Sequence, residues 1–423
     1  ISQIIEAVTK MIFGLGFSGG VMYLTQREYS LHATVLGRSY PSPEQAQAVI
    51  AQLASGAAVL GVSLSTAAGL VYLMLRWRKK GDGVSQQQLM HAPKPQDSST
   101  LLKRILVIAI PVCLGSLAVN LSGIIDLLTV TGRLSHVMDT APQQLLACYG
   151  QNIPQAELVN GTVHNYLYGA YSGKAVVIAN LVPALTTGMA VSALPAVAES
   201  FARGNRLRTQ KSIQMVLRIT ALFCVPAGLG ISALSQEVCS LFFGMNNEVM
   251  IGAPLLRVLG LASIFIALTG TTNSLLQAVG RVSLPVKLIL IGSAIKLAMN
   301  YLLVGIPQLN IQAAPWSTLV CYVVITLLSL IALRSTVGPL GAFGVFGKPL
   351  LAGLLCAAFA RLTQNMLMQV TASRFVVLLS AAVGAAVYLV GLLLLRALKK
   401  EDIMMLPKGE KMAKILEKYS LLG

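Results

Sequence analysis

"SGKAVVIANLVPALTTGMAVSALPAV", residues 172–197, decides the fold class of this chain because it is long and almost entirely apolar. A helix needs about 20 such residues to cross the hydrocarbon core of a bilayer. The stretch also contains four residues that a helix surrounded only by lipid would avoid. They are Lys174, Asn180, Pro183 and Pro195. The stretch therefore predicts a transmembrane helix with one face on protein or on a polar cavity.

The composition of the whole chain extends this prediction. Of its 423 residues, 55% are hydrophobic and 11% are charged, whereas a soluble chain carries about 25% charged residues. Apolar segments recur along the chain, and each predicts a membrane-spanning helix. The predicted spans are 3–24, 50–75, 105–130, 167–197, 214–235, 254–279, 284–304, 313–333, 348–368 and 374–395. The fold class is thus predicted to be an all-α polytopic membrane protein with about ten helices.

The net charge of +17 is distributed according to membrane topology. Lysine and arginine gather in loops 76–104 and 198–213, and they recur in every second loop and in the tail. Cytoplasmic loops are enriched in these residues, so both ends of the chain are predicted to be cytoplasmic, in a bacterial plasma membrane. This distribution accounts for the basic charge without a nucleic-acid partner.

A flexible linker is predicted over residues 79–100, "KKGDGVSQQQLMHAPKPQDSST", because this stretch is polar and contains glycine and proline.

A repeat is indicated by "EAVTKMIFGLG" (6–16) and "SAIKLAMNYLL" (293–303), each an apolar helix with one lysine. Parallel repeats of this kind occur in transporters. The second copy would be complete, whereas the first would keep only its last two helices. Because the chain also begins at Ile1 without a methionine, we expect about four N-terminal helices to be missing.

The predicted domain organisation follows from the linker and the repeat. Residues 1–80 are the last two helices of an N-terminal lobe, and 81–100 are a cytoplasmic linker. Residues 101–335 form a complete six-helix C-terminal lobe. An additional helix pair spans 336–396, and residues 397–423 form a cytoplasmic amphipathic tail whose lysines suit anionic lipid.

Ionisable residues inside a membrane normally face a cavity or a partner, so they are candidate site residues. They are Glu6, Lys10, Asp126, Lys174, Arg257, Lys296 and Arg361. Several have a structural alternative: Arg257 and Arg361 lie near predicted helix ends, where their side chains can reach the headgroups. Glu6 and Lys10 lie one turn apart and can pair.

Two of these residues are stronger candidates. Asp126 shares a polar stripe with Asn120, and Lys174 lies about two turns inside its helix. One interpretation is an ion pair between Asp126 and Lys174. The other is a water-filled cavity whose cations neutralise an anionic headgroup in transit. Pro183 and Pro195 each remove a backbone hydrogen bond, so they are predicted hinges of a lining helix.

The sequence contains no recognisable catalytic or metal-binding pattern. The six cysteines have no paired or metal-like spacing, and the four histidines form no ligand cluster. No nucleophile elbow, phosphate loop or paired-carboxylate motif is present. We therefore expect a protein that is not an enzyme and that uses neither a cofactor nor a metal.

Four segments resemble a known family. "LLKRILVIAIPVCLGSLAVNLSGIID" (101–126), "NLVPALTTGMAVSALPAVAESFARGN" (180–205) and "TNSLLQAVGRVSLPVK" (272–287) resemble the oligosaccharide-flippase branch of the multidrug/oligosaccharidyl-lipid/polysaccharide exporter superfamily. The tail "KKEDIMMLPKGEKMAKIL" (399–416) is similar to the group of stage V sporulation protein B and Gram-positive lipid II flippases. The match covers most of the chain from residue 101 onward, and the order and spacing of the segments make it fairly specific.

The resemblance implies a two-lobed, fourteen-helix transporter that moves undecaprenyl-linked sugars to the outer leaflet by alternating access. It implies a cationic central cavity to which Lys174, on the eighth helix, would contribute. The expected substrate-binding set is Lys174, Asp126, Asn120, Asn180, Arg257, Lys10 and Lys296. The expected partners are the lipid-linked oligosaccharide and membrane lipid, with cell-wall synthesis enzymes as further candidates, and the protein is expected to be a monomer.

Two other functions stay open from the sequence. A multidrug or cation antiporter of the same superfamily would use buried carboxylates, but here the intramembrane charge is mainly basic. A non-transporting cell-envelope scaffold would tolerate neutralisation of Lys174 and Asp126. The sequence favours the flippase because a lipid-linked sugar carries an anionic headgroup. It does not say which sugar is carried, what drives the transport, or whether the protein acts in sporulation.

Overall fold

The computed structural model describes residues 2–40, 43–81, 97–149, 151–341, 343–370, 373 and 375–397. The chain divides into two compact units, Ile1–Ser98 and Ser99–Gly423, which we call unit 1 and unit 2. Most of the predicted linker 81–100 and, except for Ala397, the predicted tail lie outside the described residues.

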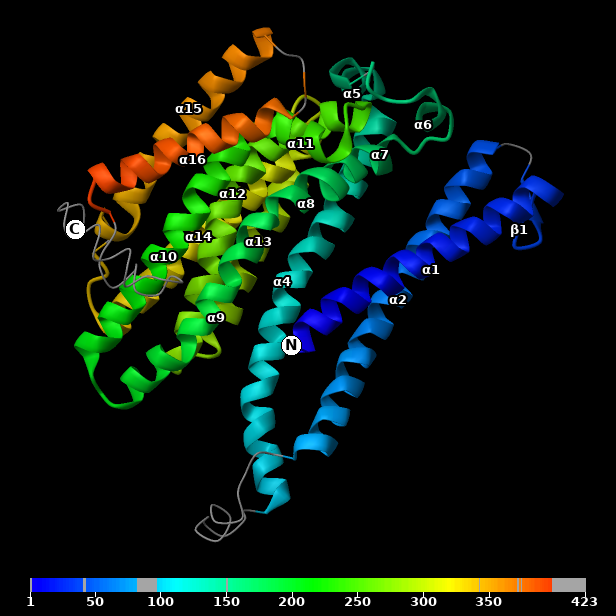
Figure 1. Ribbon diagram of the computed structural model, residues 1–423. Helices are drawn as coiled ribbons and strands as arrows, with labels where there is room; N and C mark the ends of the chain where they lie inside the picture. The colour runs from blue at the N-terminus through cyan, green and yellow to red at the C-terminus, as the bar shows by residue number, and fades with distance from the viewer. Residues whose placement is uncertain are drawn as a thin grey trace. The chain divides into compact units, whose positions relative to one another are not determined.

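Unit 1 is a pair of long helices, α1 (Ser2–His32) and α2 (Pro43–Lys80), with a two-stranded hairpin between them (Figure 1). The hairpin consists of β1 (Thr34–Val35) and β2 (Arg38–Ser39), which pair in antiparallel orientation. The Glu28 carboxylate accepts hydrogen bonds from the backbone N–H groups of the loop between the strands, at 3.1 and 3.0 Å. These hydrogen bonds favour the charged form and lower the pKa of Glu28.

Unit 2 is a helical bundle. Its elements in chain order are α4 (Ser98–Thr140), α5 (Pro142–Tyr149), α6 (Gln155–Val159), α7 (Val163–Gly169), the π-helix η1 (Ala170–Ala175), α8 (Val176–Ala179), α9 (Leu181–Ala202), α10 (Arg206–Ala233), α11 (Ser235–Phe243), α12 (Asn247–Ala278), α13 (Leu284–Leu303), the 3₁₀-helix η2 (Asn310–Gln312), α14 (Ala313–Val337), the π-helix η3 (Phe343–Gly347), α15 (Lys348–Val370) and α16 (Val376–Leu394).

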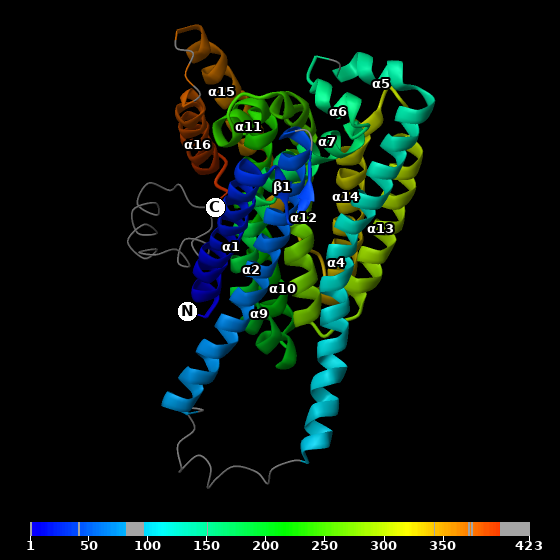
Figure 2. The same cartoon turned by 90° about the vertical axis from the view of Figure 1, so that its right-hand side faces the viewer.

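Helix α12 is central to unit 2, because it packs against α9, α10, α11, α13, α14 and η1. The pair α15 and α16 packs on α10, and it lies on the other side of α12 from α4 and α13 (Figures 1 and 2). Small residues allow the closest approaches. A Cβ atom built on Gly260 of α12 would lie 2.9 Å from the carbonyl oxygen of Gly228 of α10, so the two backbones touch there.

Seven of the described helices are long and apolar enough to cross a membrane, by length and composition. They lie in the segments Gln45–Lys79, Arg206–Ala233, Asn247–Ala278, Leu284–Leu303, Asn310–Val337, Phe343–Gln369 and Val376–Leu394. Each coincides with a predicted span, and the three other predicted spans, 3–24, 105–130 and 167–197, are also helical. The prediction of an all-α polytopic membrane protein is confirmed.

The predicted single helix 167–197 is wrong in detail. The structure has α7, a π-helical turn over 170–175, the short α8, a turn at Asn180 and then α9. Pro183 has no N–H group to donate to the carbonyl of Ala179, which is the bond that a continuous helix would make. The π-helical turn displaces Lys174 from the register that a regular helix would give it, and such turns are frequent at functional sites.

Candidate functional site

A buried ion pair lies in unit 2 between α4 and α13. The ammonium Nζ of Lys296 is 2.7 Å from Oδ2 of Asp126, and the two side chains are 3% and 9% exposed. The same ammonium donates to Oγ of Ser122 at 3.0 Å. The interpretation that Asp126 pairs with Lys174 is therefore wrong, because Lys296 occupies that role.

Neighbouring helices supply the remaining partners of the Asp126 carboxylate. The amide Nδ2 of Asn300 donates to Oδ1 at 2.8 Å, and the hydroxyl of Tyr171 in η1 donates to Oδ2 at 3.2 Å. Asn300 in turn accepts a hydrogen bond from Ser317 of α14. Each charge is thus paired and hydrogen-bonded, which a buried ion pair needs for stability. The network links α4, α13, α14 and η1, and in this structure it is closed to solvent.

Lys174 has a different partner. Its ammonium forms an ion pair with the carboxylate of Glu248 in the first turn of α12, and it donates to Oδ1 of Asn246 at 3.2 Å. It also lies 5.4 Å from the centroid of the Phe243 ring. The Lys174 side chain is 12% exposed and that of Glu248 is 39% exposed. This ion pair is therefore accessible, unlike the one at Asp126.

Arg257 lies deeper in its helix than the sequence suggests. Asn246 caps α12 by accepting a hydrogen bond from Val249 N–H at 2.9 Å, so the helix begins at Asn247 and not near residue 254. Arg257 is ten residues beyond that start, or about 15 Å along the axis. Its side chain is exposed on unit 2, and with the described residues it forms neither a hydrogen bond nor an ion pair. The prediction that it lies near a helix end is wrong.

The other predicted site residues are dispersed. Lys10 is half-buried on α1 in unit 1, and it has interactions there. Asn120 on α4 is exposed and also has an interaction. Asn180 is exposed at the turn before α9, where Pro183 is half-buried. Pro195 is exposed inside α9.

The two remaining ionisable candidates are Arg361 and Glu6. Arg361 on α15 forms an ion pair with Glu237 of α11 at 2.7 Å. The side chain of Glu6 lies outside the described residues, so its predicted pairing with Lys10 is left as a prediction.

Sequence reasoning missed Arg218, which is only 4% exposed. The predicted helix began at residue 214, which put this arginine near a membrane surface. The structure begins α10 at Arg206 because Asn205 caps it, accepting a hydrogen bond from Arg208 N–H at 3.0 Å. Asparagine is a preferred N-cap residue, so this signal was available in the sequence.

Among the described residues, no group of three or more histidine, cysteine, aspartate or glutamate side chains is arranged to hold a metal ion. The five cysteines whose side chains the structure describes are free thiols, and four of them are buried. The charged groups that the structure describes among the predicted site residues include the closed ion pair at Asp126, the accessible ion pair at Lys174 and the exposed Arg257.

A family model and a curated relative name the same family. A family model described as lipid II flippase MurJ matches residues 169–388. The lipid II flippase MurJ of Bacillus subtilis (strain 168) is 25% identical over 217 residues, which cover 48% of this chain and 39% of that protein. The chain thus matches less than half the length of this relative.

Among solved structures, the outward-facing conformation of a multidrug resistance MATE family transporter of the MOP superfamily is similar at 14% identity, with a TM-score of 0.37. That match covers 74% of this chain and 67% of the other. The region matched by the family model contains Lys174, Arg257 and Lys296, whereas Lys10, Asn120 and Asp126 precede it.

Proposed function

Because the chain belongs to the lipid II flippase MurJ family, we propose that it acts in moving an undecaprenyl-linked cell-wall precursor from the inner to the outer leaflet of the bacterial plasma membrane. The observation that carries this proposal is the family match over residues 169–388. The substrate is expected to be lipid II or a related lipid-linked sugar.

Transport of such a precursor requires that its charged headgroup be stabilised while it crosses the membrane. The polyprenyl tail can stay in lipid, but the pyrophosphate and sugar headgroup has to cross an apolar layer that excludes charge. A cation that is exposed at membrane depth and free to bind can lower that cost, and arginine can bind a phosphate group through two parallel hydrogen bonds. In the described part of unit 2, Arg257 is exposed and lies ten residues beyond the start of α12, inside a candidate membrane span, so we assign it the pyrophosphate contact.

We include Lys174 as a second contact. It is held by Glu248, whose side chain is 39% exposed, so an incoming pyrophosphate could compete with the carboxylate for the ammonium. The exposed amides of Asn120 and Asn180 in unit 2 are further candidate contacts for the headgroup, and Lys10 in unit 1 is a separate candidate. Asp126 and Lys296 would enter the route only if their ion pair opened.

The proposed mechanism is alternating access, with bends in the segment from η1 to α9. The π-helical turn at 170–175, Pro183 in the first turn of α9 and Pro195 inside α9 are three places where this segment can bend at lower cost. With both described ends assigned to the cytoplasm by their basic loops, the precursor would enter from the basic side. The protein is proposed to act as a monomer.

Replacing Arg257 with alanine tests the assignment. In a strain depleted of its own lipid II flippase, the product of the complete native gene should restore growth. The Arg257→Ala variant should lose at least about tenfold in plating efficiency, because a phosphate hydrogen bond to a charged group is worth roughly 1.5–3 kcal/mol. The fraction of lipid II cleaved by an externally added lipid II hydrolase should fall in parallel.

Arg203→Ala is the matched control, because Arg203 is an exposed arginine whose partner is Glu199, outside this site. It should restore growth as the native protein does, and Arg257→Lys should restore it in part. Normal growth with Arg257→Ala at native membrane abundance would remove Arg257 from the route. Failure of the native gene product to restore growth or to expose lipid II would overturn the proposed function, and growth without lipid II exposure would indicate the scaffold.

A double substitution separates two roles of Lys174. Lys174→Met should reduce the restoration of growth, because it removes a cation and leaves Glu248 unpaired. If Lys174 contacts the pyrophosphate, the Lys174→Met/Glu248→Gln variant should stay as defective as the single variant. If growth recovers in the double variant, Lys174 serves only to neutralise Glu248. The readout is the same growth and lipid II exposure assay, with membrane abundance measured for each variant.

A further inference from the structure

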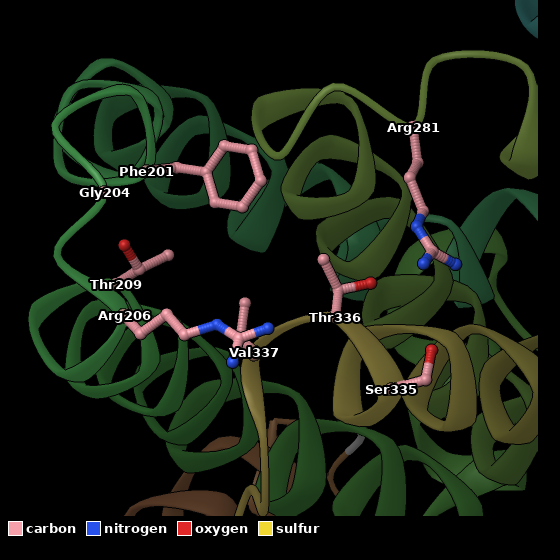
Figure 3. Close-up of a pocket in the computed structure, with 8 residues that line it drawn as sticks. All are labelled: Phe201, Gly204, Arg206, Thr209, Arg281, Ser335, Thr336 and Val337. Carbon is pink, nitrogen blue, oxygen red and sulfur yellow. The ribbon is translucent and has the colours of Figure 1, made fainter.

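A cavity of about 480 Å³ lies at one end of unit 2, where two connections of the bundle and the end of α14 converge (Figure 3). Its walls come from the α9–α10 connection, the α12–α13 connection and the last turn of α14. The lining residues are Phe201, Gly204, Arg206, Thr209, Arg281, Ser335, Thr336 and Val337. Ligand sites in proteins typically have volumes of roughly 300–1,000 Å³, so this cavity is large enough for a phosphate-bearing headgroup.

The charged side chains that line the cavity are both basic. Arg206 and Arg281 extend into it from opposite sides, as Figure 3 shows, and no aspartate or glutamate is among its lining residues. The nearest acid along the chain, Glu199, forms an ion pair with Arg203 at 2.6 Å. The two arginines of the cavity come from loops far apart in the sequence, and the fold brings them to one space.

The hydroxyl groups of the lining are already committed as donors. Ser335 and Thr336 each donate to the carbonyl oxygen of Ala332 at 2.8 Å, and Thr209 donates to that of Asn205 at 2.9 Å. The side-chain donors that remain for a ligand are therefore the two guanidinium groups. A guanidinium group can bind two phosphate oxygens through parallel hydrogen bonds.

Helix ends contribute both positive and negative partial charges at the cavity. The N-terminus of α10 begins at Arg206 and contributes partial positive charge, whereas α12 and α14 end at the cavity and contribute partial negative charge. The helix ends alone would therefore not select an anion. Selection depends on Arg206 and Arg281, which makes the site testable by substitution of these two residues.

We propose that this cavity binds a phosphate group, either on the headgroup of an anionic membrane lipid or on a soluble phosphate. It lies at the end of unit 2 that the distribution of basic residues predicts to be cytoplasmic, where anionic lipid surfaces attract arginine and lysine. The site is separate from Lys174, Glu248 and Arg257, and it does not depend on the proposed transport function.

The test uses the 423-residue chain in two arms. In detergent, the dissociation constant of pyrophosphate is measured by calorimetry. In nanodiscs, native mass spectrometry counts the phosphatidylglycerol molecules retained against a phosphatidylcholine background. Arg206→Gln/Arg281→Gln is compared with the control Arg203→Gln/Arg334→Gln, which removes two exposed arginines at the same end of unit 2 but outside the cavity lining.

The cavity variant should weaken binding at least about tenfold in one or both arms, because both bidentate donors are lost, while the control stays within twofold of the native chain. Loss in the nanodisc arm alone identifies a lipid headgroup, and loss in the pyrophosphate arm alone identifies a soluble phosphate. Equal binding by the cavity variant and the control in both arms overturns the proposal. Should the glutamine variant fail to fold, Arg206→Lys/Arg281→Lys replaces it, and it should bind more weakly than the native chain, since lysine keeps the charge but loses the paired geometry.

Discussion

Replacement of Lys296 by alanine is expected to lower the free energy of unfolding of unit 2 by about 3–5 kcal/mol, because it leaves the Asp126 carboxylate charged, buried and without its cation. The two side chains are 3% and 9% exposed, so water does not compensate for the loss. The measurement is the thermal unfolding of the purified chain in detergent, followed by circular dichroism.

The double variant Lys296→Met/Asp126→Asn is the control for this prediction. It removes both charges and keeps side chains of similar volume, and replacement of a whole buried ion pair by neutral groups is often close to neutral. It should therefore recover most of the stability that Lys296→Ala loses. A Lys296→Ala variant as stable as the native chain would mean that the pair is not buried as the structure has it.

Replacement of Gly260 by valine is expected to destabilise unit 2 by about 3 kcal/mol or more, through a clash between α10 and α12. A Cβ atom at Gly260 would lie 2.8 Å from the backbone nitrogen of Ser232 and 2.9 Å from the carbonyl oxygen of Gly228. Both atoms belong to the backbone, so neither can move aside as a flexible side chain would. The helices would have to separate along their contact.

Gly270 provides a matched control on the same helix, because a Cβ atom there would meet nothing within 4 Å. Gly270→Val carries the same cost of a β-branched residue in a helix, so the difference between the two variants isolates the contact with α10. Both are measured by thermal unfolding in detergent. Gly260→Ala, a milder change, should lie between native and Gly260→Val. Equal midpoints for Gly260→Val and Gly270→Val would contradict the close approach.

The sequence predicted which charged residues of the candidate site lie in membrane spans, but not which residues they pair with. Hydropathy located Asp126, Lys174 and Lys296 inside predicted spans, because an ionisable residue is conspicuous in an apolar segment. It did not identify their partners. Asp126 meets Lys296, 170 residues further along the chain, and Lys174 meets Glu248. Such pairs depend on which helices are neighbours and on how each is rotated, and hydropathy contains neither.

The positions of Arg218 and Arg257 within their helices were predicted wrongly for the same reason. Hydropathy placed the starts of α10 and α12 at the edge of their apolar runs, near residues 214 and 254. The capping hydrogen bonds of Asn205 and Asn246 extend the helices to Arg206 and Asn247. As a result, Arg218 and Arg257 lie well inside their helices.

Amino-acid composition and the length of the apolar runs were sufficient for the fold class and the positions of the membrane-spanning helices, because burial in lipid acts on each segment separately. The π-helical turn at Lys174, the closed ion pair at Asp126 and the presence of Arg206 and Arg281 in the lining of one cavity were visible only in the tertiary structure. They depend on contacts between residues distant in the chain, whose free energies exist only once the helices have assembled.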